Sequence, residues 1–80
     1  MEFKTQGWDK EYTIYMEQRI QASIGQMIRL EWDERPNTFL ERFSVHGIIR
    51  QVEDKDLNFQ INGGSVIKVL KGGVTNIKNV

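Results

Sequence analysis

The sequence has no cysteine and only one histidine, His46. The lack of cysteine excludes disulfides, thiol nucleophiles and cysteine-ligated zinc, and one histidine is too few for a histidine-based metal site. No segment reaches the roughly 18 apolar residues of a membrane span, and residues 1–7 lack the apolar core of a signal peptide. We therefore expect a cytoplasmic protein with no cofactor, no metal and no membrane association.

Net charge is also lacking. The 80 residues contain 11 basic and 11 acidic side chains, and 39% of the chain is hydrophobic. These values are typical of a globular protein and argue against a polybasic coat for nucleic acid. The length predicts a single domain over residues 1–80, with a small core that an oligomer would help to stabilise. The tail over residues 57–80 is mildly basic, since it contains lysines and no acid.

A helix is predicted over residues 9–23. Tyr12, Met16 and Ile20 recur every four residues, which places them on one helical face. The alternative is a strand over residues 12–16, whose Tyr-Thr-Ile-Tyr sequence has high β propensity. The expected end signals are Asp9 as the N-cap and Gly25 as the terminating residue.

After the helix the apolar period changes to two, which predicts β-strands. The predicted strands cover residues 28–32, 39–53, 57–61, 66–70 and 74–80, and turns or loops cover residues 33–38, 54–56, 62–64 and 71–73. In the second strand the apolar parity changes at Gly47, and a glycine at such a change indicates a bulge or a sharp bend.

Closing five bent strands on themselves removes most exposed strand edges. The sequence therefore predicts a mainly β fold with one N-terminal helix. We expect a five-stranded, strongly bent antiparallel barrel of the SH3-like or Sm-like type over residues 26–80. An open α+β sheet is the alternative.

Two short motifs carry a family resemblance. Residues 45–49 read Val-His-Gly-Ile-Ile and residues 54–61 read Asp-Lys-Asp-Leu-Asn-Phe-Gln-Ile, while residues 69–74 read Val-Leu-Lys-Gly-Gly-Val. This order resembles the Sm-like proteins (Sm, Lsm and Hfq), although the interval from Gly47 to Asp54 is one residue longer and lysine replaces the usual arginine before the glycine. A similar pattern of apolar residues, glycine and turns occurs in the YolD-like small proteins of Gram-positive bacteria and their phages.

The Sm-like resemblance implies a ring-forming homo-oligomer that binds single-stranded RNA. The resemblance implies that Asn58 hydrogen-bonds to a base edge and that Lys71, beside Gly72, contacts a base or a phosphate. Lys68 would add attraction for phosphate. The alternative interpretation makes Asn58 a solvated strand residue and Lys71 an ordinary turn residue.

Other candidate residues have structural alternatives. Trp8 and Trp32 are candidate interface anchors, although Trp32 is also suited to the core and Trp8 to stapling the helix. The loop over residues 33–38 is a candidate contact surface or a solvated loop. Neither His46 nor the acidic turn over residues 53–56 has the partners that catalysis or metal binding requires.

The sequence thus predicts a non-catalytic binding module, oligomeric, with single-stranded RNA as its most specific candidate ligand. The alternative is a protein-interaction module, or a small phage or bacterial regulator, that binds a protein and no nucleic acid.

Overall fold

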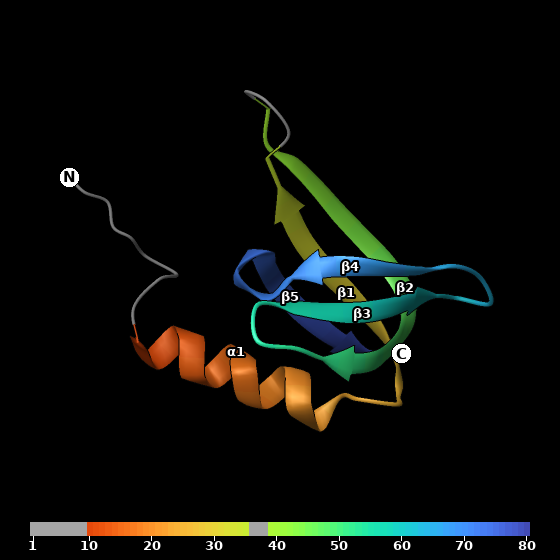
Figure 1. The fold of residues 1–80 in the computed structure, drawn as a ribbon, viewed down its shortest axis with the longest axis horizontal. Helices are drawn as coiled ribbons and strands as arrows, with labels where there is room; N and C mark the ends of the chain where they lie inside the picture. Colours follow the sequence, from red (N-terminus) through yellow and green to blue (C-terminus); the bar gives the residue numbers. More distant parts are fainter. Residues whose placement is uncertain (1–9, 36–38) are drawn as a thin grey trace.

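The computed structural model describes residues 10–35 and 39–80 and contains one helix and five strands (Figure 1). The helix α1 covers Lys10–Ala22, so the helical interpretation of this segment is confirmed. The strands are β1 (Met27–Glu34), β2 (Glu41–Val52), β3 (Asp56–Ile61), β4 (Val66–Leu70) and β5 (Val74–Asn79), and a 3₁₀ turn, η2 (Lys71–Gly73), joins the last two. Asp9, the expected N-cap, lies outside the described residues.

The strands form one antiparallel sheet in the order β4-β3-β2-β1-β5. The mainly β architecture with one helix is thus confirmed. The sheet is not closed, because no ladder joins β4 to β5 within the part of the chain that the structure describes. Both strands are therefore edges of the sheet.

The long strand β2 is shared between the two halves of the sheet. Its first part pairs with β1, from Glu41 to Ile48, and its last part pairs with β3, beginning at Gly47. Figure 1 shows β2 turning sharply along its length, as predicted. A Cβ atom on Gly47 would lie 2.2 Å from the main-chain oxygen of Gln60 and 2.6 Å from Cζ of Phe59. Only glycine fits here, because the neighbouring strand and its aromatic ring approach so closely.

The change of parity in β2 lies three residues beyond the predicted position. The β2–β3 register shifts between Ile49 and Gln51, which leaves Arg50 as the extra residue of a bulge. Ile49 is fully buried and Ile48 only partly, so inward-facing positions continue past Gly47. The predicted parity change at Gly47 was wrong because this glycine marks a close contact and the bulge sits elsewhere.

The buried core combines residues of the sheet with residues of α1. Met16 and Ile20 are the buried residues of the helix, and Tyr12 packs against the same cluster. The strands contribute Ile28, Leu30, Trp32, Ile49, Leu57, Phe59, Val69, Val74 and Ile77. The predicted helical stripe therefore faces the sheet, and its burial accounts for the position of α1.

Polar contacts fix α1 to the sheet at its C-terminal end. The guanidinium of Arg19 donates to the main-chain oxygen of Ile77 in β5 and to the hydroxyl of Tyr15. Beyond the helix, Gly25 adopts a φ of +83° and its N–H donates to Ile49 O at 3.0 Å. The left-handed conformation turns the chain from the helix into β1, which glycine allows at little cost.

Trp32 lies in the core and is only 3% exposed. Its ring stacks on Phe43 at a centroid distance of 5.2 Å and meets Phe59 edge-on at 6.0 Å, while Nε1 donates to Glu34 Oε2 at 3.0 Å. The interpretation of Trp32 as a core residue is thus confirmed, and almost none of its surface is accessible to a partner. Trp8 lies outside the described residues.

The predicted loop over residues 33–38 begins later than expected. Asp33 and Glu34 belong to β1, where Asp33 pairs across the ladder with Arg42 and forms an ion pair at 2.8 Å. This cross-strand pair extends the strand past the apolar alternation. Phe39 is 71% exposed and precedes β2, and residues 36–38 lie outside the described residues.

Candidate functional site

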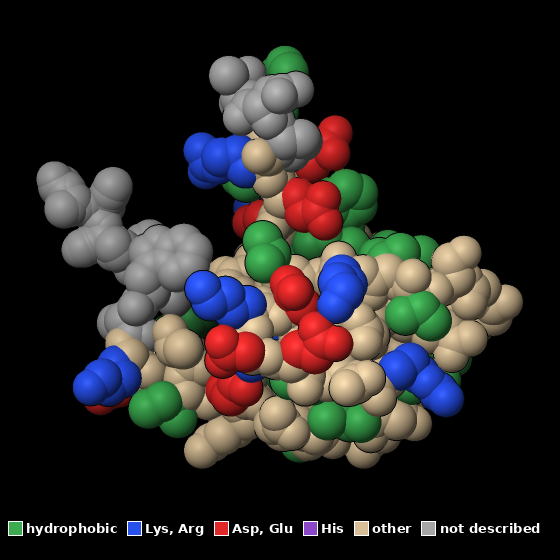
Figure 2. Space-filling view, viewed as in Figure 1, with side chains coloured by type: hydrophobic (Ala, Val, Ile, Leu, Met, Phe, Trp, Pro, Cys, Tyr) green, Lys and Arg blue, Asp and Glu red, His purple; other side chains and the backbone are tan. Residues whose placement is uncertain are grey.

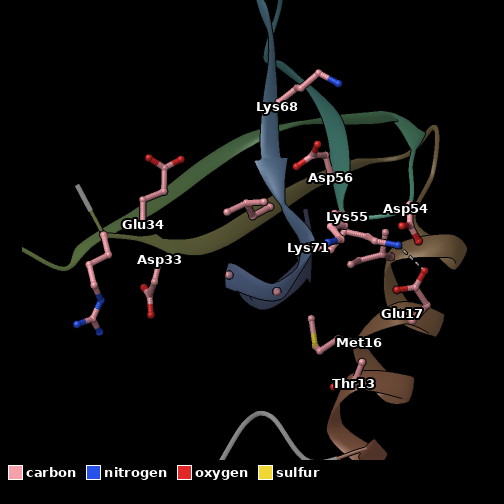
Figure 3. Close-up of a pocket in the computed structure, with 15 residues that line it drawn as sticks. Thr13, Met16, Glu17, Asp33, Glu34, Asp54, Lys55, Asp56, Lys68 and Lys71 are labelled. Carbon is pink, nitrogen blue, oxygen red and sulfur yellow. Dashed lines mark hydrogen bonds and ion pairs between the residues drawn. The ribbon is translucent and has the colours of Figure 1, made fainter. Parts of the chain in front are cut away.

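A groove of about 860 Å³ lies between α1 and one end of the sheet (Figure 3). Its walls are formed by the helix, by residues 33–35 at the end of β1, by the turn over residues 54–56, and by the end of β4 with η2. Apolar side chains of Met16, Ile20 and Leu70 contribute to its lining. Two of these are buried in the core, whereas Leu70 is 62% exposed, so the groove presents an accessible apolar surface.

The turn η2 brings the main chain to the rim of the groove. A Cβ atom on Gly73 would lie 2.6 Å from the main-chain oxygen of Asp33, so η2 lies directly against the end of β1. Gly72 has no atom within 4 Å of its would-be Cβ and is exposed. The rim at Gly72 therefore leaves space for an incoming group, whereas Gly73 fixes the position of the turn.

Two of the three lysines that line the groove form ion pairs with carboxylates. Lys71 Nζ lies 2.9 Å from Glu17 Oε2 of α1, and the lysine side chain is only 14% exposed. Figure 3 shows this pair spanning from the helix to the opposite wall. Lys68 Nζ lies 2.9 Å from Glu53 Oε1 on the exposed face of the sheet. The charges of Lys71 and Lys68 are thus each balanced by an adjacent carboxylate.

The Lys68–Glu53 pair shifts the pKa values of both groups. The hydrogen bond from Lys68, with its positive charge second, lowers the pKa of Glu53, and Asn58 also hydrogen-bonds to this carboxylate. The same hydrogen bond, followed by the charge of Glu53, raises the pKa of Lys68. Both groups are thus held in their charged forms by each other.

The sequence-predicted RNA contacts are brought together only in part. Asn58 and Lys68 are directly opposite each other across the β3–β4 ladder. Lys68, Lys71 and Gly72 line the groove, whereas Asn58 does not. The two lysines and the asparagine therefore lie in the same region, but both lysines are already paired within the chain.

The other polar candidates lie in separate places. Asp54 and Asp56 line the groove beside Lys55. In residues 10–35 and 39–80, no group of three or more His, Asp or Glu side chains is arranged to hold a metal ion. His46 lies on β2 opposite Arg29, away from the groove, and its main-chain oxygen accepts from Asn62 N–H at 3.0 Å.

Sequence reasoning missed the helical and apolar part of this groove. The sequence pattern indicated only a core role for Met16, and it indicated no role in a site for Glu17 or Leu70. The signal for Leu70 was its parity, because a leucine at an outward position of an alternating strand is exposed unless something covers it. No sequence signal linked Glu17 to Lys71, since the two residues are far apart along the chain.

Across the described ranges, no helix has the length and apolar composition needed to cross a membrane. No protein-family model, no curated protein and no solved structure matches this chain. The arguments for function therefore rest on the groove and on the two edges of the sheet.

Proposed function

We propose that this chain is a non-catalytic protein-binding module whose groove receives a segment of a partner protein. The observation that carries the proposal is Leu70, an exposed leucine in a concave surface with Met16 and Ile20. When a partner covers an accessible apolar side chain in a groove, the burial of its surface contributes favourably to the free energy of binding. A partner side chain placed there would bury Leu70 against a surface that the core already holds in place.

The charges around the groove favour protein over RNA. Five carboxylates and four cations line it. These are Glu17, Asp33, Glu34, Asp54 and Asp56 against Arg35, Lys55, Lys68 and Lys71. Figure 2 shows acidic and basic side chains intermixed on this face. A phosphate chain would meet nearby carboxylates and compete with them for the lysines, which weakens the attraction on which RNA binding depends.

The experiment selects peptides from a displayed library of short random sequences against the full chain, then measures their affinities by isothermal calorimetry. Leu70→Ser is expected to weaken binding by about 5- to 30-fold, since it removes roughly 1–2 kcal/mol of apolar burial. Ile14→Ser is the matched control, because Ile14 is also an exposed apolar residue, at 50%, but does not line the groove. Failure to select any peptide sensitive to Leu70→Ser contradicts the proposal.

The second candidate is a ring of copies of this chain that binds single-stranded RNA. It is favoured by the strand order with a bent β2, and by Asn58 lying opposite Lys68. In this arrangement each sheet curves into a Sm-like or SH3-like barrel that stays open between β4 and β5. The edge β4 of one copy pairs with β5 of the next, which forms a homo-oligomeric ring. The YolD-like resemblance is compatible with either candidate.

Fluorescence anisotropy with U-rich and A-rich oligonucleotides at low salt tests the RNA candidate. No binding at about 10 μM protein eliminates it, because non-specific affinities already reach that range. Light scattering on the same sample reports the number of copies. A hexamer or heptamer favours the ring, and a monomer favours the protein-binding module.

A further inference from the structure

The main-chain groups on the outer edge of β4 have no partner strand in the described part of the chain. Hydrogen bonds from Ile61 N to Ser65 O and from Lys71 N to Lys55 O, both 2.9 Å, fix which residues of β4 bond to β3. Antiparallel ladders alternate, and the register is regular between these two bonds. The N–H and C=O groups of alternate residues therefore point outward, away from the sheet. These residues are Val66, Lys68 and Leu70.

This edge lacks the features that usually protect an exposed strand. Residues 66–70 contain no proline, and the β3–β4 register shows no bulge. The one charged side chain, Lys68, is held on the face of the sheet by Glu53 at 2.9 Å. Val66 is 56% exposed and Leu70 62%. The edge is thus an apolar strand with its single charge already neutralised.

The edge is continuous with the groove. Leu70 ends β4 and also lines the groove, as does Lys68. A segment lying along β4 therefore reaches the apolar lining near Met16 without leaving the protein surface. Backbone hydrogen bonds along the edge and apolar contacts in the groove would then be made by one partner segment.

We propose that the partner segment binds in an extended conformation, as an additional strand on the outer edge of β4. This inference rests on the proposed function and names its partner class: an extended peptide with apolar side chains beside Val66 and Leu70, and with no charge required beside Lys68. A second copy is a poorer match through either of its free edges. Its β5 carries the exposed polar residues Thr75 and Lys78, and antiparallel pairing of two β4 strands about their centre would place one Lys68 opposite the other.

The peptides selected in the groove experiment are used to test this mode of binding. Each peptide nitrogen in turn is methylated, which removes one N–H donor. In an added strand alternate nitrogens face β4, so we expect methylation to reduce affinity by about tenfold or more at every second position and much less between them. A helical or irregular bound peptide would not give this alternation.

A variant of the chain provides the reciprocal measurement. Lys68→Pro removes an outward N–H that has no partner within the sheet, and edge strands tolerate proline at such positions. Lys68→Ala is its reference, since both variants lack the ammonium group. We expect Lys68→Pro to bind the peptides about tenfold more weakly than Lys68→Ala. Circular dichroism establishes whether Lys68→Pro folds, and if it does not, the methylation series decides.

The outcomes separate the two proposals. Peptides that respond to Leu70→Ser, and that show the alternating methylation effect, support strand addition. Peptides that respond to Leu70→Ser without alternation overturn strand addition while the groove remains a binding site. If no peptide depends on Leu70, the proposed function itself fails. If light scattering shows an oligomer that Lys68→Pro dissociates, a second copy occupies the edge and the proposed partner class is wrong.

Discussion

Replacing Gly47 with alanine tests the packing at the bend of β2. The added Cβ would lie 2.2 Å from Gln60 O and 2.6 Å from Phe59 Cζ. Gln60 O belongs to the main chain of β3, so it moves only if the β2–β3 ladder shifts. Phe59 is fully buried in the core, which leaves its ring little room to rotate away.

The expected cost follows from these two contacts. Overpacking a core by one methyl group typically costs about 1–3 kcal/mol, and alanine regains roughly 0.5–1 kcal/mol over glycine through its lower backbone entropy. Because backbone blocks the methyl group, we expect a gross cost of about 3–4 kcal/mol, at or above the upper end of the overpacking range. After the entropy gain of alanine, the net loss is about 2–3 kcal/mol. This is a large share of the ~5 kcal/mol expected for so short a chain.

Urea unfolding followed by tryptophan fluorescence measures the loss. With a slope near 1 kcal/mol/M for a small domain, the midpoint should fall by about 2–3 M. Gly72→Ala is the control, since its Cβ would meet nothing within 4 Å, and its midpoint should stay close to that of the unchanged protein. If Gly47→Ala unfolds within about 0.5 kcal/mol of Gly72→Ala, the close approach at Gly47 is not a constraint on the fold.

The remaining predictions concern the core and the ion pairs. Trp32→Ala should lower the free energy of unfolding by about 3–5 kcal/mol, as measured in urea, because it empties a site that is almost fully buried; a loss under 1 kcal/mol would contradict this. Glu17→Gln should destabilise by about 1–2 kcal/mol and Lys71→Met by less, since only the first leaves a largely buried ammonium without its carboxylate; equal losses would refute this asymmetry. NMR titration should place the pKa of Glu53 below its ordinary value and Lys68→Ala should restore it. Because folding lowers the pKa of Glu53, the Lys68–Glu53 pair stabilises the folded chain above the unfolded pKa of Glu53, and this stabilisation is lost as the pH falls through the folded pKa. Lys68→Ala should therefore make the free energy of unfolding less dependent on pH in this acidic range. Under the RNA candidate, Glu17→Gln combined with Glu53→Gln should strengthen oligonucleotide binding in fluorescence anisotropy at low salt, and unchanged affinity would show that these lysines do not meet phosphate.

The elements of the fold were predictable because their signals are local. The alternation in residues 66–70 depends on neighbouring residues only, and β4 has the predicted bounds. The four-residue recurrence of Met16 and Ile20 likewise identified the buried face of α1. Secondary structure in this chain thus follows from periodicity, which a short window of sequence contains.

Features that depend on pairing between strands were less predictable. The bulge at Arg50 is a property of the β2–β3 register, and it leaves no local mark in a strand that also contains Gly47. The extension of β1 to Glu34 depends on Asp33 meeting Arg42 across the ladder. Whether the sheet closes depends on still more distant parts of the chain, because β4 and β5 meet only if the bends of all the strands between them bring the two edges together.

The candidate site was the hardest part to predict, because its chemistry is decided by which charges meet. A count of 11 basic and 11 acidic residues is the same whether charges are separated into patches or paired. In the folded chain Glu17 of α1 neutralises Lys71 and Glu53 neutralises Lys68. The tail that is basic in sequence is therefore not a basic surface where these lysines lie. Leu70 and the outer edge of β4 remain accessible beside exposed charges of both signs, and this mixture suits the proposed polypeptide partner more than a polyphosphate.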